Sequence, residues 1–162
     1  TRSVGVTGVQ TCALPIYIGE KVVKTLKEFG VDYEVKVISA HRSLDLALDY
    51  CRDIDKNNIE VLIAIAGKAA HLAGVLAGIV TIPVIGIPVK ASALEGLDAL
   101  LSTVQMPKGV PVATVAIDGG ENAAILAVEM LAVKYPELKR ALKDYKVKMK
   151  QMILDSNNDL SL

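Results

Sequence analysis

Aromatic side chains are scarce in this sequence, which has no tryptophan, one phenylalanine and five tyrosines. Because stacking on aromatic rings is a common way to hold single-stranded nucleic acid, this scarcity argues against a nucleic-acid partner. Acidic and basic residues balance at 18 each, so the chain has no excess positive charge to attract a polyanion. We therefore expect neither nucleic acid nor an acidic macromolecule as partner.

Cysteine is nearly absent, since Cys12 and Cys51 are the only two. Two cysteines cannot build a disulfide framework or a metal cluster, so we expect no metal and a reducing, cytoplasmic setting. Lysine and glycine interrupt every apolar run before the ~18 residues of a membrane span, so we expect no membrane partner. Neither GxGxxG nor a Walker loop occurs, which argues against dinucleotide and ATP cofactors.

The chain is nevertheless rich in apolar residues, which make up 52% of its 162 residues, enough for one globular domain. Short runs rich in valine and isoleucine alternate with helical patterns. These runs cover residues 33–39, 61–67, 83–89 and 111–118. Continuous apolar runs suit strands buried on both faces, and their alternation with helices predicts a doubly wound α/β domain with a parallel sheet.

Helical patterns lie between these runs. The first begins after Ser43, a candidate capping residue, and its apolar stripe includes Cys51, which we assign to the core. Residues 92–95 read Ser-Ala-Leu-Glu, a capping box that predicts the start of a second helix. A third stripe consists of Ala123, Ala124, Ala127, Met130 and Leu131.

Residues 136–154 are predicted to form a last helix, with Pro136 in its first turn. Its apolar stripe consists of Leu138, Leu142, Tyr145, Met149 and Met152. Its basic residues are interpreted as a solvated face, because acidic residues elsewhere balance them. Such a helix has no evident place on a five-stranded sheet, so we predict that it docks on a neighbouring subunit. Residues 155–162 are predicted to be a flexible tail.

Both histidines follow predicted strands, where parallel α/β sheets bind their ligands. His41 precedes Arg42, whose guanidinium fork suits phosphate or carboxylate. His71 lies in a segment of small residues, which let backbone approach a ligand closely. Histidine is the side chain best suited to exchange a proton at neutral pH. The residues alone thus predict an α/β enzyme for a small anionic substrate, with His41 as proton carrier; an ordinary loop histidine is the alternative.

Several of these segments also carry a family likeness. The motifs are "SAHR", "GKAAHLAG", "PVIGIPVKASALEGLDALLSTVQMPKGVPVATVAI" and "NAAILAVEML". Together, over about residues 19–133, they resemble the N5-carboxyaminoimidazole ribonucleotide mutases of purine (IMP) biosynthesis. The resemblance implies a three-layer, flavodoxin-like α/β/α sandwich that forms a homo-octamer, with its C-terminal helix on a neighbouring subunit. It also implies a ribonucleotide substrate and transfer of a carboxylate to ring carbon four without a cofactor.

The resemblance also implies roles for residues at the strand ends. His41 would be the acid/base and Arg42 would hold the ribose phosphate. The remaining substrate-binding positions would be Ser39, Ala40, Gly67, Ala69, Ala70, His71 and Leu72. Met106 and Pro107 match a segment near the site, whereas Ala91 stands where relatives often have serine.

The start of the chain departs from the family. A Gly-Ser-x-Ser-Asp loop should follow the first strand, but a gapless count places Cys12 and Pro15 at its phosphate- and ribose-binding Ser and Asp. Proline has no N–H and cysteine is a weak donor, so neither replaces the family residue. The segment "VTGVQTCALPI" is similar to translated adapter DNA. We predict that residues 1–18 are non-native, that residues 19–154 are the mutase domain, and that this literal chain is impaired; a divergent loop is the alternative.

Two other functions fit the same residues. One is the related carboxylase, which uses aminoimidazole ribonucleotide and free carbon dioxide. The other is a non-catalytic nucleotide-binding subunit or scaffold. Loss of the Ser/Asp loop favours the scaffold, whereas the pair His41 and Arg42 argues against it.

Overall fold

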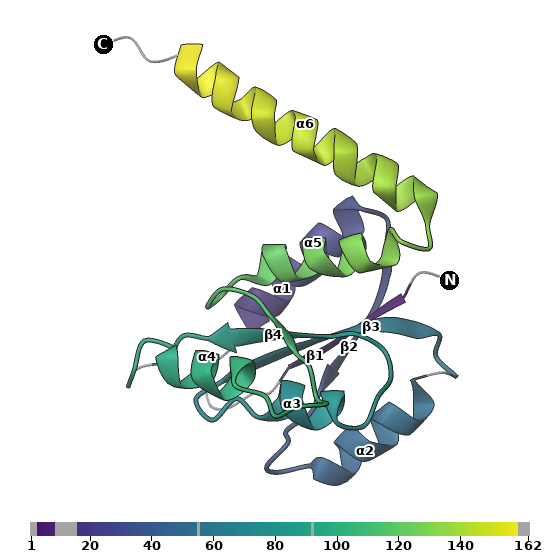
Figure 1. Cartoon of the computed structure of the whole chain (residues 1–162), viewed down its shortest axis with the longest axis vertical. Coiled ribbons are helices and arrows are strands. Elements are labelled where there is room, and N and C mark those ends of the chain that lie inside the picture. Colours follow the sequence, from purple (N-terminus) through teal and green to yellow (C-terminus); the bar gives the residue numbers. More distant parts are fainter. Residues whose placement is uncertain (1–2, 9–15, 55, 92, 159–162) are drawn as a thin grey trace.

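A computed structural model describes residues 3–8, 16–54, 56–91 and 93–158 of the chain. Strands and helices alternate from the first strand to the fifth helix, and a sixth helix follows (Figure 1). The strands are β1 (Ser3–Gly8), β2 (Asp32–Val37), β3 (Ile59–Gly67), β4 (Val84–Val89) and β5 (Ala113–Thr114). The helices are α1 (Ile16–Glu28), α2 (Leu44–Asp53), α3 (Leu72–Ala77), α4 (Leu97–Val104), α5 (Gly120–Leu131) and α6 (Pro136–Asn158).

The strands form one parallel sheet in the order β2-β1-β3-β4-β5. Figure 1 shows α1 and α5 on one face of this sheet and α2, α3 and α4 on the other. The order is that of flavodoxin-like folds, in which the chain reverses its winding direction between β1 and β3. The predicted doubly wound, three-layer fold is therefore confirmed.

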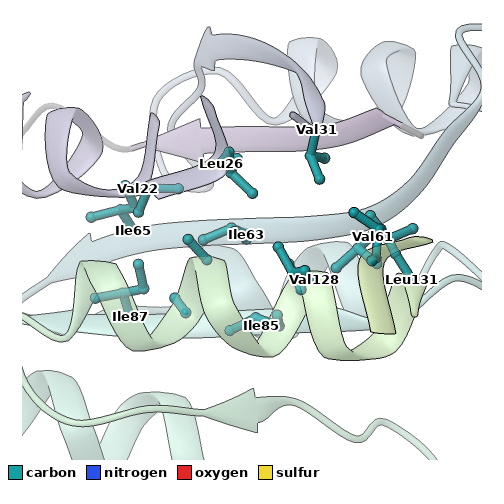
Figure 2. Close-up of a cluster of buried hydrophobic side chains, with 14 of the residues drawn as sticks. Val22, Leu26, Val31, Val61, Ile63, Ile65, Ile85, Ile87, Val128 and Leu131 are labelled. Atoms are coloured by element: carbon teal, nitrogen blue, oxygen red, sulfur yellow. The ribbon is translucent and has the colours of Figure 1, made fainter. Parts of the chain in front are cut away.

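The core on the α1/α5 face explains why β3 and β4 could be predicted from the sequence. Ile63 and Ile65 of β3 and Ile85 and Ile87 of β4 are almost fully buried beneath the two helices (Figure 2). Val22, Leu26, Val128 and Leu131 cover them from α1 and α5. A second core, which includes Leu62 and Ala64, fills the opposite face. Both faces of these strands are buried, so their sequences are nearly continuously apolar.

Two strands differ from the prediction. The run 33–39 was expected to be buried on both faces, but β2 is an edge strand whose Val35 and Val37 are 52% and 67% exposed. The run 111–118 yields only the two-residue β5. Its later residues keep irregular contact with β4, since the Asp118 N–H donates to the carbonyl of Pro88 at 2.9 Å.

The first strand lies within the segment predicted to be non-native. Ser3–Gly8 pairs with β2 on one side and β3 on the other. Cys12 and Pro15 lie outside the described residues. The non-native origin of residues 1–18 stays a prediction.

One predicted helix start is confirmed without its expected cap bond, and the other is wrong. Ser43 occupies the N-cap position of α2 but makes no side-chain cap bond, because its hydroxyl donates to the carbonyl of Ser39 at 3.2 Å. Ser92 of the predicted capping box lies outside the described residues, and α4 begins at Leu97 after Gly96 rather than within residues 92–95. Gly96 adopts φ 91°, and Glu95 pairs with the Lys90 ammonium instead of capping a helix.

The last helix has more contact with its own domain than predicted. Leu138 and Leu142 are buried in the core, and the Tyr145 ring lies 5.5 Å from that of Phe29. Beyond Tyr145 the helix projects away from the domain (Figure 1), and its apolar side chains there are exposed. These exposed residues are Val147, Met149, Met152, Ile153 and Leu154.

Helix α6 also extends beyond the predicted end at 154. Residues 155–158 are helical rather than a tail, because Asp155 accepts a hydrogen bond from Gln151 and the Ser156 hydroxyl donates to the Met152 carbonyl. Residues 159–162 lie outside the described part. None of the helices in the described ranges is long and apolar enough to cross a membrane.

A polar contact anchors the start of α6 to the sheet. Lys134 and the Tyr135 hydroxyl both donate hydrogen bonds to the Glu60 carboxylate at the start of β3. Partial burial opposes ionisation of Glu60, but the two donors outweigh it and lower the pKa of this carboxyl. The anchor lies at the amino-terminal edge of the sheet, opposite the strand ends that carry both histidines.

Candidate active site

The loops after β2 and β3 meet at the carboxyl edge of the sheet. These two strands flank β1, so the residues that follow them lie on either side of the β1 carboxyl end. This edge includes the point where the winding reverses, where doubly wound sheets bind their ligands. The predicted site residues therefore converge on the position that topology favours.

A tight turn shapes the loop after β2. Ser39 is 8% exposed, and its carbonyl accepts hydrogen bonds from the N–H groups of Arg42 and Ser43 at 3.4 and 2.9 Å. The Ser39 N–H donates in return to the Ser43 hydroxyl at 2.9 Å, and Arg42 Nε donates to Ser39 Oγ at 3.4 Å. With both ends of the turn fixed, His41 and Arg42 project to the surface while half-buried Ala40 lies beneath them.

The two histidines contact each other. His41 Nε2 lies 2.8 Å from His71 Nδ1, and the rings meet edge to face with centroids 5.0 Å apart. Two neutral imidazoles at this distance share one proton, because one nitrogen must donate and the other accept. The contact therefore couples the tautomers: if His71 Nδ1 accepts, His41 Nε2 carries a proton and its Nδ1 is an acceptor.

The loop after β3 combines buried and exposed positions. Ala70 and Leu72 are 1% exposed, so these two residues anchor the loop through packing. Ala69 and His71 are exposed and face solvent at the edge. Lys68 adopts a left-handed φ of 57°, a conformation that turns the chain sharply after Gly67. Ligand contacts in this segment therefore come from exposed side chains and backbone.

Met106 lies against the helix that follows His71. A methyl group added to Gly74 would stand 2.7 Å from Met106 Cε, so glycine is what allows this side chain to pack on α3. Gly74 is one turn beyond His71 in the chain, which places the half-buried Met106 near the candidate site. The predicted neighbour Pro107 follows it and is exposed.

Cys51 is not a candidate nucleophile. It is a free, buried cysteine on α2, and burial raises the pKa of its thiol. Neighbouring Tyr50 is also buried, and burial together with the nearby Glu34 charge raises its pKa. The core assignment of Cys51 is confirmed. Within the described ranges, no group of three or more His, Cys, Asp or Glu residues is arranged to hold a metal.

One residue at this edge was not singled out by sequence analysis. Asp118 accepts a hydrogen bond from the Lys90 N–H at 3.0 Å and has a left-handed φ of 58°. The available signal was an aspartate between an apolar run and two glycines, a typical setting for that backbone conformation.

Comparison with known proteins gives consistent matches. The family model described as AIR carboxylase matches residues 14–152. A Pyrococcus abyssi N5-carboxyaminoimidazole ribonucleotide mutase is 58% identical over 132 residues, covering 82% of this chain and 76% of that protein. A phosphoribosylaminoimidazole carboxylase of Schizosaccharomyces pombe is 47% identical over 135 residues, covering 83% of this chain but 24% of that protein. The crystal structure of Treponema denticola PurE superposes with a TM-score of 0.89 at 25% identity, covering 99% of this chain and all of that one.

Proposed function

This chain belongs to the AIR carboxylase family, and we propose that it is an N5-carboxyaminoimidazole ribonucleotide mutase of purine biosynthesis. The observation that carries the proposal is the pairing of His41 with His71 at the edge of the sheet. The test is incubation of the chain with N5-carboxyaminoimidazole ribonucleotide while formation of the 4-carboxy isomer is followed.

In the proposed reaction, His41 donates one proton to the substrate and later takes one proton back. His41 in its protonated form gives a proton to the exocyclic nitrogen of the carbamate and becomes neutral, the nitrogen–carbon bond breaks, and carbon dioxide is released. Ring carbon four then forms a bond to the same carbon dioxide, and His41 removes the proton from that carbon. Its exposed position at the edge makes this ring accessible to a bound substrate.

His71 supports this role by orienting the His41 ring. A hydrogen bond to one imidazole nitrogen determines which tautomer is present and how the ring lies. The 2.8 Å contact supplies that bond from a residue at the N-cap of α3, whose position is set by buried Leu72. A proton can also pass between the His41 and His71 rings through this contact.

Arg42 and the turn at Ser39 are proposed to hold the phosphate. The Arg42 Nε donates a hydrogen bond to Ser39 Oγ at 3.4 Å, which orients a guanidinium fork of the kind that binds phosphate. Ser39 itself is buried, so its main part in binding would be to fix the turn.

A carboxylase that uses free carbon dioxide is the second candidate, favoured by the similarity to the Schizosaccharomyces pombe enzyme. It would need the same ring chemistry without the carbamate. Supplying aminoimidazole ribonucleotide with bicarbonate, in parallel with the carbamate substrate, separates the two reactions. Product from the carbamate alone supports the mutase.

A non-catalytic scaffold is the third possibility, and it would bind ribonucleotide without converting it. Calorimetric binding with no product from either substrate, even after restoration of the phosphate loop, supports that function. We also propose a cytoplasmic setting, which suits the free thiol of Cys51.

Replacing His71 with leucine should lower turnover by about 10-fold to 10²-fold, because a misoriented catalytic ring reacts more slowly. His71→Asn should recover most of the loss, since its amide offers polar atoms near the position of Nδ1. Single-turnover measurements on both variants test the orienting role. Equal turnover in His71→Leu and His71→Asn would show that the hydrogen bond to His41 does not contribute to catalysis.

We further propose that copies of the chain assemble through α6 into a homo-octamer. The support is the cluster of exposed apolar side chains beyond Tyr145, which stand away from the domain (Figure 1). Burial of one such side chain contributes roughly 1.5–3 kcal/mol, and symmetry repeats the contribution in every copy.

Met152→Lys is expected to shrink the assembly, because it places a charge within the exposed apolar cluster, where Met152 is 66% exposed in the single chain. Gln151→Lys adds the same charge on the face of Val147 and Leu154, so an intact assembly in that variant shows that the face of Met149, Met152 and Ile153 forms the contact. A chain ending at Lys146 should also be smaller, although it keeps buried Leu138 and Leu142. Light scattering distinguishes these results, and an unchanged octamer for Met152→Lys, or a monomeric parent, contradicts the proposal.

A further inference from the structure

Asp118 ties the loop after β4 to the end of β5. Its carboxylate accepts a hydrogen bond from the Lys90 N–H at 3.0 Å, between residues 28 positions apart in the chain. Its own N–H donates to the Pro88 carbonyl at 2.9 Å. Asp118 thereby binds the residue on either side of Val89 and fixes the point where β4 becomes the loop that begins at Lys90.

Both ends of this arrangement have a left-handed backbone conformation. Asp118 has φ 58° and Glu95, near the end of the loop, has φ 53°. Aspartate tolerates this conformation, whereas glutamate adopts it rarely. Here the contact that holds the loop is the bond from the Lys90 N–H to Asp118, because the ion pair between the Lys90 ammonium and Glu95 is exposed and contributes little.

The fixed loop adjoins the candidate active site. A methyl group on Gly67 would lie 3.4 Å from the Val89 carbonyl and 3.5 Å from Val89 Cβ, so the ends of β3 and β4 are in close contact. Gly67 begins the loop that carries His71. Lys90 and half-buried Ala91 therefore follow a strand end that lies beside the start of the His71 loop.

We propose that Asp118 is a positioning residue that holds Lys90 and Ala91 at the rim of the active site and prevents escape of carbon dioxide before recapture. The second half of this inference rests on the proposed mutase function. Asp118 exchanges no proton and forms no bond with substrate. Its effect is to determine how often the released carbon dioxide carboxylates the ring and how often it is lost.

Four variants, two that lose the hydrogen bond and two controls, isolate its effect. Asp118→Asn keeps an acceptor and tolerates the left-handed backbone, whereas Asp118→Gly fits that backbone but has no acceptor. Lys90→Pro removes the donor from the other side of the bond and leaves Asp118 intact. Lys90→Met is its control, because it keeps the N–H and loses only the charge.

The first measurement is amide hydrogen exchange of Ala91 and residues 93–96 in the full chain, which does not depend on activity. Asp118→Gly and Lys90→Pro should exchange at least about 10-fold faster, and their controls should match the parent. Unchanged exchange in both loss variants overturns the proposal, whether or not the mutase function holds.

The second measurement is the ratio of aminoimidazole ribonucleotide released to 4-carboxy isomer formed, in the chain with its phosphate loop restored. The ratio should rise about 10-fold in Asp118→Gly and stay at the parent value in Asp118→Asn. An equal rise in Asp118→Asn, or none in Asp118→Gly, overturns the role in retaining carbon dioxide. Absence of product from the parent itself contradicts the mutase function instead, and the exchange result still decides the positioning.

Discussion

His41→Asn is expected to bind the ribonucleotide with little change in affinity while its turnover falls by ~10²-fold or more. Asparagine keeps a polar side chain beside His71 but cannot take up and return a proton at neutral pH. The 2.8 Å contact and the exposed position of His41 at the strand edge motivate the prediction. Turnover at saturating substrate and calorimetric affinity should be measured on the same preparation, in a chain with its phosphate loop restored.

A matched control is available one turn along the chain. Asp45→Asn changes an exposed residue in the first turn of α2 and should leave turnover near the parent value. Near-normal turnover in His41→Asn would show that His41 is not the acid/base, and His71 would then be the next residue to test. A loss of affinity as large as the loss of turnover would show that His41 binds substrate rather than moving a proton.

Replacing residues 1–18 with a strand that ends in Gly-Ser-x-Ser-Asp is expected to strengthen ribonucleotide binding by about two to four orders of magnitude. Each hydrogen bond to a charged group contributes roughly 1.5–3 kcal/mol, and this chain lacks the two side chains that should supply them. In the unaltered chain, Arg42 and the helix N-termini would still bind the ribonucleotide weakly. Calorimetry with the ribonucleotide on both chains measures the difference.

A smaller change separates binding from folding in this experiment. Cys12→Ser combined with Pro15→Asp restores only the two side chains and keeps the residues of β1, which pair with β2 and β3. If this double variant matches the full replacement, the lost side chains explain the weak binding. Equal affinity for the unaltered and the fully replaced chain would mean that residues 1–18 are a functional variant.

The sequence predicted elements whose burial is set by their own composition. β3 and β4 are apolar throughout because both cores contact them, and the stripe of α5 is buried as its period requires. The exposure of Val35 and Val37 was not predicted, because it depends on β2 being an edge strand. Edge position is a property of strand order, which a local pattern does not contain.

The same limit applies to the site. The sequence placed His41 and His71 at one edge, but their contact at 2.8 Å requires that β2 and β3 both neighbour β1. The start of α4 was mispredicted because Glu95 pairs with Lys90 across the loop rather than with its own helix. Asp118 was missed for a related reason: its partner Lys90 lies 28 positions away.

The position of β1 has a consequence for how the chain folds as it is synthesised. β1 comes first in sequence but lies inside the sheet, with Ser3 opposite Ile59 and Gly8 opposite Ile65. One edge of this strand therefore stays unpaired until β3 has left the ribosome, although β2 can cover the other edge earlier. Pairings so distant in sequence slow folding, and an unpaired edge invites association with other chains. The yield of folded protein should thus depend on the sequence of the first strand, independently of any part its following loop has in binding.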